Sequence, residues 1–409
     1  MGIDSVMQAV KSLEDEYGVL EWNEQFSQFV IVGEAAPRRA FMEYLRSKVA
    51  QVTSENRANI FSQNYVRWSQ RELLNIDFDY QAITTRDYTF RLYYSNVAML
   101  KGQIQYALRT WRDAIAVDQP KGQFIYCYVG PNSNLDAIKN ITTDIMRSTL
   151  EGWGCDWELG APVVVQFLHD ADGTFGEKIA EYWILQEQMN DSEAAQFTNF
   201  ILDRQEAVFQ EMENLFSELE KSRHLVFATG KEIVASRIKN ILTQLLDEIY
   251  CQRIPFPFDG FDKVRGNAPQ DCRDFTRVMF LGNFDRDYIQ GLGSRQKNRA
   301  IAVFDESWGV LDNDGSLRSL PRNNRVRDII SAIEKRLSTD KEVMEAINIG
   351  ELLRTLCAPP YGCNIASVGL LLALFFGRRK KDLNLRKNSQ NISIENWLME
   401  AISGNYLNL

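Results

Sequence analysis

Two carboxylates that follow an apolar, strand-like run are the residues in this sequence best placed to do chemistry. Residues 161–168 (APVVVQFL) are followed by His169 and then by Asp170-Ala171-Asp172-Gly173-Thr174. A carboxylate at the carboxyl end of a strand can attack phosphorus while magnesium neutralises the phosphate charge. An Asp- and Gly-rich turn between a strand and a helix is also common, because both residues tolerate tight backbone angles. We favour the structural turn and keep phosphoryl chemistry as the alternative.

The five residues from Asp170 to Thr174 resemble the first motif of the haloacid-dehalogenase-type phosphohydrolases. This resemblance implies Asp170 as the nucleophile, Asp172 as the acid/base, and a magnesium ion held by carboxylates. It also implies further members of the site elsewhere in the chain. These would be Thr229 for the second-motif hydroxyl, Lys263 for the basic third motif, and Asp285 and Asp287 for the acidic fourth motif.

A complete phosphate loop or metal shell is missing from the sequence. Residues 228–232 (ATGKE) lack the earlier glycine of a GxxxxGK[ST] loop, whose backbone amides cradle phosphates. Thr229-x-x-Glu232 is predicted instead to be a capping box that opens a helix. His169 is predicted to be a packing residue, and Cys357 and Cys363 supply only two of the four ligands of a structural zinc. We therefore expect no metal, no cofactor and no ATP hydrolysis by this chain alone.

The clearest electrostatic feature is a cluster of cations near the carboxyl end of the chain. Residues 377–388 hold six cations against one acid, Asp382, in a protein whose formal net charge is −9. The cations are Arg378, Arg379, Lys380, Lys381, Arg386 and Lys387. They lie between an apolar helix and a predicted hairpin, which is the element order of a winged-helix module whose wing contacts phosphates. A solvated hairpin is the alternative, since charge runs are usually solvated.

The elements that position these residues are predicted to form an α/β protein. A length of 409 residues with 45% apolar content suits two or three folding units. Four segments are expected: a mostly helical N-terminal segment 1–118, an α/β layer 119–260, a helical and loop connector 261–340, and a winged-helix-like module 341–409. Within the first segment, residues 26–32 and 88–94 have strand-like patterns.

The α/β layer is predicted to be a small parallel sheet built from three strand-to-helix units. Its strands are expected at 122–129, 161–168 and 225–228, with right-handed crossovers between them. A long helix at 191–222 carries an apolar stripe and is predicted to pack along another helix, as an arm or a lid. The module at 341–409 is expected to end in a hairpin at 381–394 and a final helix.

The composition limits where the protein works. The acidic N-terminus has no basic region followed by an apolar stretch, so no secretory signal is predicted. The longest apolar run, 368–376, is shorter than the ~20 residues that cross a bilayer. We expect a soluble, cytoplasmic protein without a membrane partner, whose contacts with nucleic acid are confined to a local patch.

Several stretches resemble parts of the large P-loop ATPases of bacterial phage-defence islands, similar to the BREX-system ATPases. They are residues 86–114, the strand 122–131 (GQFIYCYVGP), the turn 255–261 (PFPFDGF), and residues 352–376 followed by the basic cluster. None of these stretches is a catalytic signature. The resemblance implies a region outside the ATPase core, either a fragment of a longer polypeptide or a stand-alone relative.

We therefore expect a non-catalytic regulatory region of a defence-type ATPase. It would bind nucleic acid, DNA or RNA, through the C-terminal basic wing, and other protein domains or subunits through the long helix. One alternative is a magnesium-dependent phosphohydrolase that uses Asp170 and Asp172. The other is a pure protein-interaction scaffold.

Overall fold

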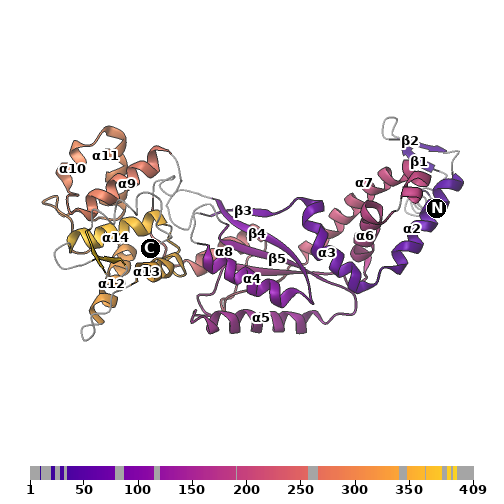
Figure 1. Cartoon of the computed structure of the whole chain (residues 1–409), viewed down its shortest axis with the longest axis horizontal. Coiled ribbons are helices and arrows are strands. Elements are labelled where there is room, and N and C mark those ends of the chain that lie inside the picture. Colours follow the sequence, from indigo (N-terminus) through magenta and orange to yellow (C-terminus); the bar gives the residue numbers. More distant parts are fainter. Residues whose placement is uncertain are drawn as a thin grey trace.

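The computed structural model describes residues 10, 20–23, 28–31, 35–78, 87–114, 120–189, 191–256, 266–339, 348–363, 365–379, 385–387 and 390–393. The molecule is elongated, with a central sheet between a helical arm and a helical carboxyl-terminal unit (Figure 1). None of the described helices combines the length and the apolar character that a membrane span needs.

The central sheet has five strands in the order β3-β4-β5-β6-β7. They are β3 (Leu73–Asp77), β4 (Asp87–Asn96), β5 (Gly122–Val129), β6 (Val163–His169) and β7 (His224–Phe227). Strands β4, β5 and β6 are parallel, whereas β3 and β7 pair antiparallel at the two ends. The α/β class is confirmed, but the sheet is mixed and not wholly parallel.

Strands β3 and β4 come from the segment that was predicted to be mostly helical. In β4 the side chains of Tyr88, Phe90, Leu92 and Tyr94 alternate into one buried cluster, as the period of a strand requires. Strand β4 then pairs with β5 from Phe90 to Asn96. The predicted boundary between residues 118 and 119 therefore cuts through a continuous sheet.

The direction of β7 follows from the connection that precedes it. A single crossover helix brings the chain back to the end of the sheet where the preceding strand began, so the next strand is parallel to it. After β6 the chain instead runs out through α6 (Thr174–Trp183) and back through α7 (Asp191–Lys221). These two helices return the chain to the end of the sheet where β6 finished, so β7 starts there with His224 opposite Phe167 and runs antiparallel to β6. A strand was predicted at 225–228 and is present as β7, but its predicted parallel direction was wrong for this reason.

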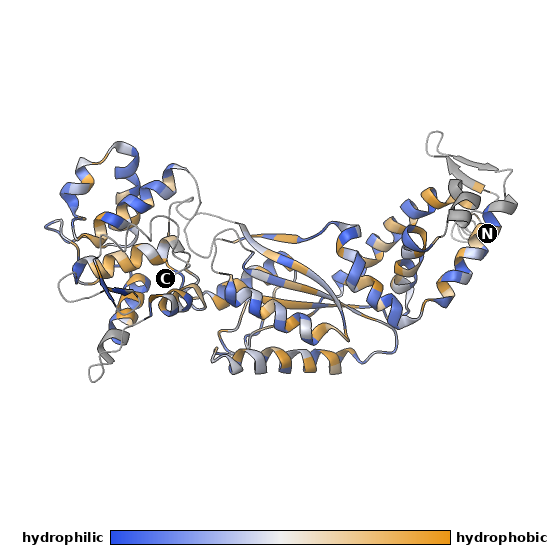
Figure 2. Cartoon of the chain, in the orientation of Figure 1, coloured by the Kyte–Doolittle hydropathy of each residue, from blue (hydrophilic) through white to orange (hydrophobic). Residues whose placement is uncertain are grey.

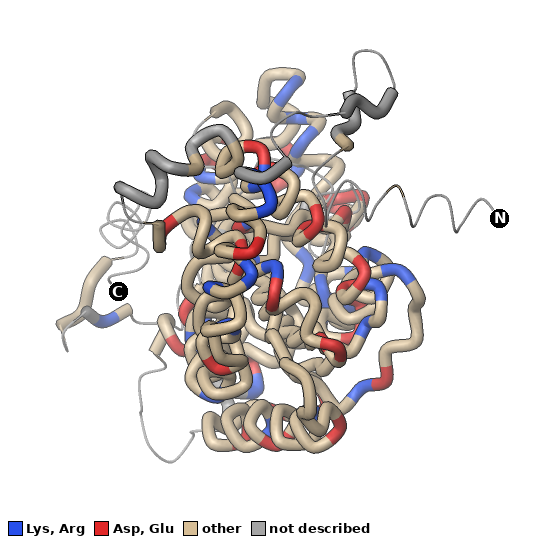
Figure 3. The backbone as a smooth tube through the Cα atoms, turned by 90° about the vertical axis from the view of Figure 1, so that its right-hand side faces the viewer, with Lys and Arg blue, Asp and Glu red and all other residues tan. Residues whose placement is uncertain are grey.

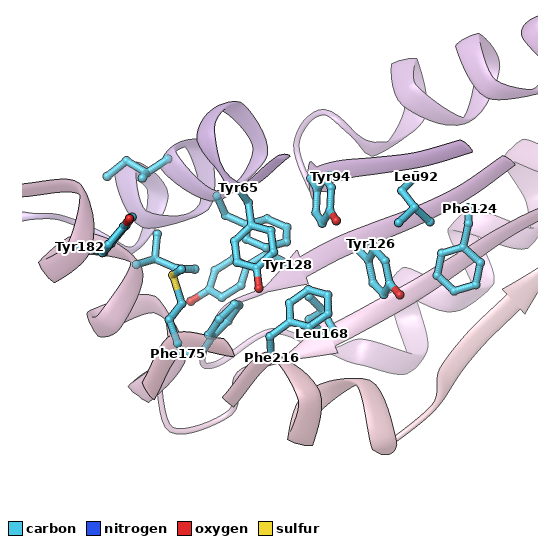
Figure 4. Close-up of a cluster of buried hydrophobic side chains, with 14 of the residues drawn as sticks. Tyr65, Leu92, Tyr94, Phe124, Tyr126, Tyr128, Leu168, Phe175, Tyr182 and Phe216 are labelled. Carbon is cyan, nitrogen blue, oxygen red and sulfur yellow. The ribbon is translucent and has the colours of Figure 1, made fainter. Parts of the chain in front are cut away.

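Helices cover both faces of the sheet. On one face, α4 (Leu100–Asp113) and α5 (Leu135–Gly152) bury an aliphatic core with β5 and β6. The other face is covered by α3 (Ser54–Ser69), α7 and α8 (Ile238–Ile249), and its core is rich in aromatic rings (Figure 4). Buried phenols in this core donate to carboxylates. The pairs are Tyr65 with Glu213 at 2.7 Å, Tyr126 with Glu220 at 2.5 Å and Tyr128 with Asp170 at 2.9 Å.

The helical arm extends beyond the carboxyl ends of the parallel strands (Figure 1). It contains α2 (Ala35–Gln51), α6, the π-helix η1 (Ile184–Gln188) and the first part of α7, beside the small hairpin of β1 (Leu20–Asn23) and β2 (Gln28–Ile31). Helix α7 kinks at Phe197, whose ring lies 5.2 Å from that of Phe41. Arg204 and Glu181 pair at 2.7 Å between α7 and α6. The predicted packing of the long helix along another helix is confirmed.

The helices of the carboxyl-terminal unit share a single apolar core. Its elements are α9 (Asn267–Phe280), α10 (Arg286–Gly291), α11 (Ser294–Ala300), the π-helix η2 (Ile301–Ser307), α12 (Asn324–Thr339), α13 (Ile349–Cys357), α14 (Ile365–Arg378), β8 (Leu385–Lys387) and β9 (Gln390–Ile392). Helix α14 packs on α9, with Phe280 and Phe376 stacked at 5.6 Å. Residues 261–340 are therefore not a connector, because they build half of this core.

The predicted hairpin is present as the antiparallel pair β8 and β9. The predicted final helix lies outside the described residues. Two helices and a short hairpin do not by themselves establish a winged helix, so the finer fold of this module stays a prediction.

The sheet and the carboxyl-terminal unit have separate apolar cores. In sequence order, Tyr250 is the last residue of the aromatic core of the sheet, and Ile254 is the first residue of the carboxyl-terminal core. Between them, Gln252 N donates to Pro360 O at 3.0 Å. Figure 2 shows hydrophobic residues concentrated on the strands and on α14.

Candidate functional site

The carboxyl end of β6 holds Asp170 in a closed set of hydrogen bonds. Its Oδ2 accepts from Tyr128 Oη at 2.9 Å and from Gly176 N at 2.8 Å, and its Oδ1 accepts from Phe175 N at 3.1 Å. The residue is only 2% exposed. These donors come from β5 and from the first turn of α6, so the carboxylate fastens that helix to the sheet.

The two acids of this turn have opposite electrostatic surroundings. Burial raises the pKa of the Asp170 carboxyl, although the amide of Gly176 and the Tyr128 hydroxyl oppose that shift. Asp172 is exposed, and hydrogen bonds from the Thr174 amide and side chain lower its pKa. Asp172 therefore stays ionised at the surface, whereas Asp170 is enclosed by donors that already use both of its oxygens.

The other residues implied by the phosphohydrolase resemblance do not converge on Asp170. Thr229 follows β7, which runs antiparallel to β6, and therefore lies at the opposite end of the sheet. At ~3.3 Å per residue, the seven residues of β6 separate these ends by about 20 Å. Asp285 caps α10 by accepting from Tyr288 N at 2.7 Å, and Asp287 is in the same helix in the carboxyl-terminal unit. Lys263 lies outside the described residues.

The predicted capping box at Thr229 and Glu232 is wrong. Thr229 Oγ1 accepts from Lys231 N at 3.2 Å, which closes a tight turn, and it donates to Glu158 O at 3.3 Å. The following helix, α8, begins only at Ile238. The hydroxyl bonds two residues ahead and so forms a turn, which a four-residue motif cannot distinguish from a helix cap.

The predicted basic wing is partly engaged within the protein. Arg378 is half-buried at the end of α14, where it donates to Ser319 O and where burial lowers its pKa. Arg379 pairs with Glu334 of α12 at 2.5 Å. Arg386 is exposed on β8 and donates to Asn391 Oδ1 at 3.3 Å. Lys380 and Lys381 and the side chain of Lys387 lie outside what the structure describes.

The contact from Arg378 to Ser319 brings a second basic segment to the end of α14. Residues 318–327 carry four arginines and lie in the segment 261–340, which was predicted from sequence to be a helical and loop connector. We call the combined set the arginine cluster: Arg318, Arg322, Arg325, Arg327, Arg378 and Arg379. Arginine density in 318–327 was the available signal, but its proximity to residue 378 is set by the fold.

Charge is divided unevenly along the chain. Residues 1–265 hold 26 Lys and Arg against 38 Asp and Glu, a net −12, whereas residues 266–409 hold 20 against 17, a net +3. Seen from the arm end, acidic and basic residues are interspersed (Figure 3). Attraction for a polyanion is therefore expected at the carboxyl-terminal unit and not over the whole surface.

His169 was predicted to be a packing residue without a second histidine nearby in sequence, and the structure places the second histidine beside it. The pairing of β6 with β7 brings the rings of His169 and His224 to 6.2 Å between centroids. Burial, then the neighbouring Lys139 and His169, lower the pKa of His224. The two histidines are 55 residues apart in the sequence, so only the strand pairing reveals them as neighbours.

Within the described residues, no group of three or more His, Cys, Asp or Glu side chains could hold a metal ion. Cys357 and Cys363 are thiols on either side of a turn, and burial raises the pKa of each. Comparison with known proteins adds no identity: no protein family, curated protein or solved structure matches this chain.

Proposed function

We propose that this protein is a non-catalytic binding protein whose carboxyl-terminal unit holds the phosphate backbone of nucleic acid. The observation that carries the proposal is the contact between Arg378 and Ser319 O, which joins two arginine-bearing segments 59 residues apart. Guanidinium groups bind phosphate through paired, charge-assisted hydrogen bonds. A concentration of them in an otherwise acidic protein favours a polyanion.

The exposed arginines carry most of the expected affinity. Arg322 and Arg325 are exposed, and so is Arg386 on the β8–β9 hairpin. Arg318 pairs with Asp312 at 3.1 Å and Arg379 with Glu334, so their charges are partly neutralised. Contacts of this kind position a protein on a duplex without reading its sequence, so we expect weak sequence preference.

The phosphohydrolase alternative is not favoured by the geometry. Asp170 uses both oxygens to hold α6, and Thr229 is about 20 Å away along β6. A role within a larger defence-type ATPase remains a proposal that rests on the sequence resemblance alone. Absence of a GxxxxGK[ST] loop from the neighbouring coding sequence would reject that role.

Fluorescence anisotropy with a labelled DNA duplex tests the binding proposal. The variant is Arg322→Gln/Arg325→Gln/Arg386→Gln, and the matched control, Lys101→Gln/Arg109→Gln/Lys239→Gln, removes three exposed cations of the sheet unit. The affinity for the duplex should fall in the arginine variant and should stay unchanged in the control variant. The slope of log K against log salt should decrease by about 0.9 for each DNA phosphate that the variant no longer neutralises. Equal affinity and slope in the arginine variant and the unmodified protein would reject the proposal.

A further inference from the structure

The only two histidines of the 409-residue sequence lie together where the parallel strands have their carboxyl ends. His169 ends β6 and His224 begins β7. Since Phe167 is the partner of His224, the two histidines are diagonal neighbours across the strand pair. Val163, Val165 and Phe167 belong to the core beneath α4 and α5, so the alternation of β6 places His169 on that same face.

Helix α5 adds a cation to this pair. Lys139 Nζ lies 3.5 Å from His224 Nδ1, and its side chain is 27% exposed. An ammonium can only donate, so the imidazole accepts at Nδ1 and carries its proton at Nε2. The nearest carboxylate partner of Lys139, Asp136, is 4.0 Å away and 90% exposed, so it neutralises the lysine weakly.

The arrangement suits an anion better than a metal ion. A lysine ammonium against a potential ligand nitrogen repels a cation, and the described residues hold no three-ligand group. Ligands of open α/β sheets bind outside the carboxyl ends of the strands, where β6 ends. Helix α5 begins nearby, after its Asn134 cap, and the positive end of its dipole adds to the same field.

We propose that Lys139, His169 and His224 form a binding site for a phosphate group, separate from the arginine cluster. The lysine supplies a fixed charge, and each imidazole supplies an N–H donor that becomes cationic on protonation. The charged and titratable groups around His224 are Lys139 and Asp136 on α5 and His169 on β6. A bound phosphate offsets the repulsion among the three cations, so binding strengthens as pH falls and the histidines become protonated.

Histidine NMR tests this site directly, because each histidine gives one Cε1–H signal and His169→Asn or His224→Asn assigns it. Inorganic phosphate is added at pH 6 and matched in ionic strength by chloride. Both signals should move with one dissociation constant, and His224 should titrate at higher pH in phosphate than in chloride. A short DNA duplex is the second probe. Movement with phosphate alone indicates a small phosphorylated ligand, and movement with both probes indicates nucleic acid as the source.

Lys139→Gln should weaken phosphate binding about tenfold or more, because a charge-assisted hydrogen bond is lost. Lys239→Gln on α8 is the matched control and should leave the dissociation constant unchanged. Signals that move equally in chloride and phosphate, or equally in Lys139→Gln and the unmodified protein, would overturn the proposal. Dispersed spectra of each variant establish that it is folded. These results do not depend on Arg322, Arg325 or Arg386, so this site and the proposed function can fail separately.

Discussion

Removing the Asp170 carboxylate distinguishes a structural turn from a site of phosphoryl transfer. In Asp170→Ala, the hydroxyl of Tyr128 and the amides of Phe175 and Gly176 lose their acceptor. At about 1–2 kcal/mol for each of these three buried donors left unpaired, the free energy of unfolding should fall by about 3–6 kcal/mol. Asp172→Ala is the matched control in the same turn. It removes an exposed acceptor for Thr174 N and should cost less than about 1 kcal/mol.

Urea denaturation followed by tryptophan fluorescence measures both changes. In parallel, phosphate release from a generic phosphate ester with magnesium is compared between the unmodified protein and Asp170→Asn. A structural turn predicts a large loss of stability in Asp170→Ala and no magnesium-dependent release by either protein. The reasoning is refuted if Asp170→Ala is as stable as Asp172→Ala while Asp170→Asn abolishes a measurable phosphatase activity.

Two further expectations concern the packing of the two cores. At the crossing of α14 with α9, a methyl group on Gly377 would overlap Met279 O, so Gly377→Ala should lower the free energy of unfolding by about 3 kcal/mol. On the same helix, a methyl group on Gly369 meets open space, so Gly369→Ala should raise the free energy of unfolding by up to about 1 kcal/mol. Equal urea midpoints for the two variants would contradict this packing. Alkaline pH should unfold the sheet unit, because burial raises the pKa of several tyrosines, to about 12 for Tyr94 and Tyr250. These neutral phenols contribute fully to the free energy of unfolding below pH ~10, the pKa of tyrosine in the unfolded chain. Above that pH the free energy of unfolding falls by about 1.4 kcal/mol per pH unit for each tyrosine that is ionised only in the unfolded chain. Burial also raises the pKa of Tyr65, Tyr126 and Tyr128. Stability measured by urea titration between pH 9 and 12 checks this, and a flat profile would contradict it.

Local pattern was sufficient for the elements whose own residues decide their structure. The runs at 122–129 and 161–168 are apolar enough to be buried on both faces, and both are central strands. The helix at 135–152 begins directly after Asn134, a residue type that favours helix caps, and Asn134 accepts from Ala137 N at 3.0 Å. In each case the signal lies within a few residues of the structure that it determines.

The remaining features depend on where the chain returns after a long excursion. The direction of β7 is set by the paired helices α6 and α7, and no residue within 224–227 records it. The same return places His224 beside His169. Likewise, Arg378 reaches Ser319 only because α14 packs across α9 and α12. Sequence distance therefore hid the histidine pair and the second arginine segment beside Arg378, although every one of these residues was visible in the sequence.

The three residues between Tyr250 and Ile254 have a consequence for synthesis on the ribosome. All residues of the first two cores precede position 251, so that part of the chain can bury its apolar surface before the rest is translated. Among the described residues, the carboxyl-terminal core draws only on positions from 254 onward, so it can form afterwards without reopening the first. Folding in order along the chain would keep the strongly apolar helix at 365–378 from meeting an unfinished sheet.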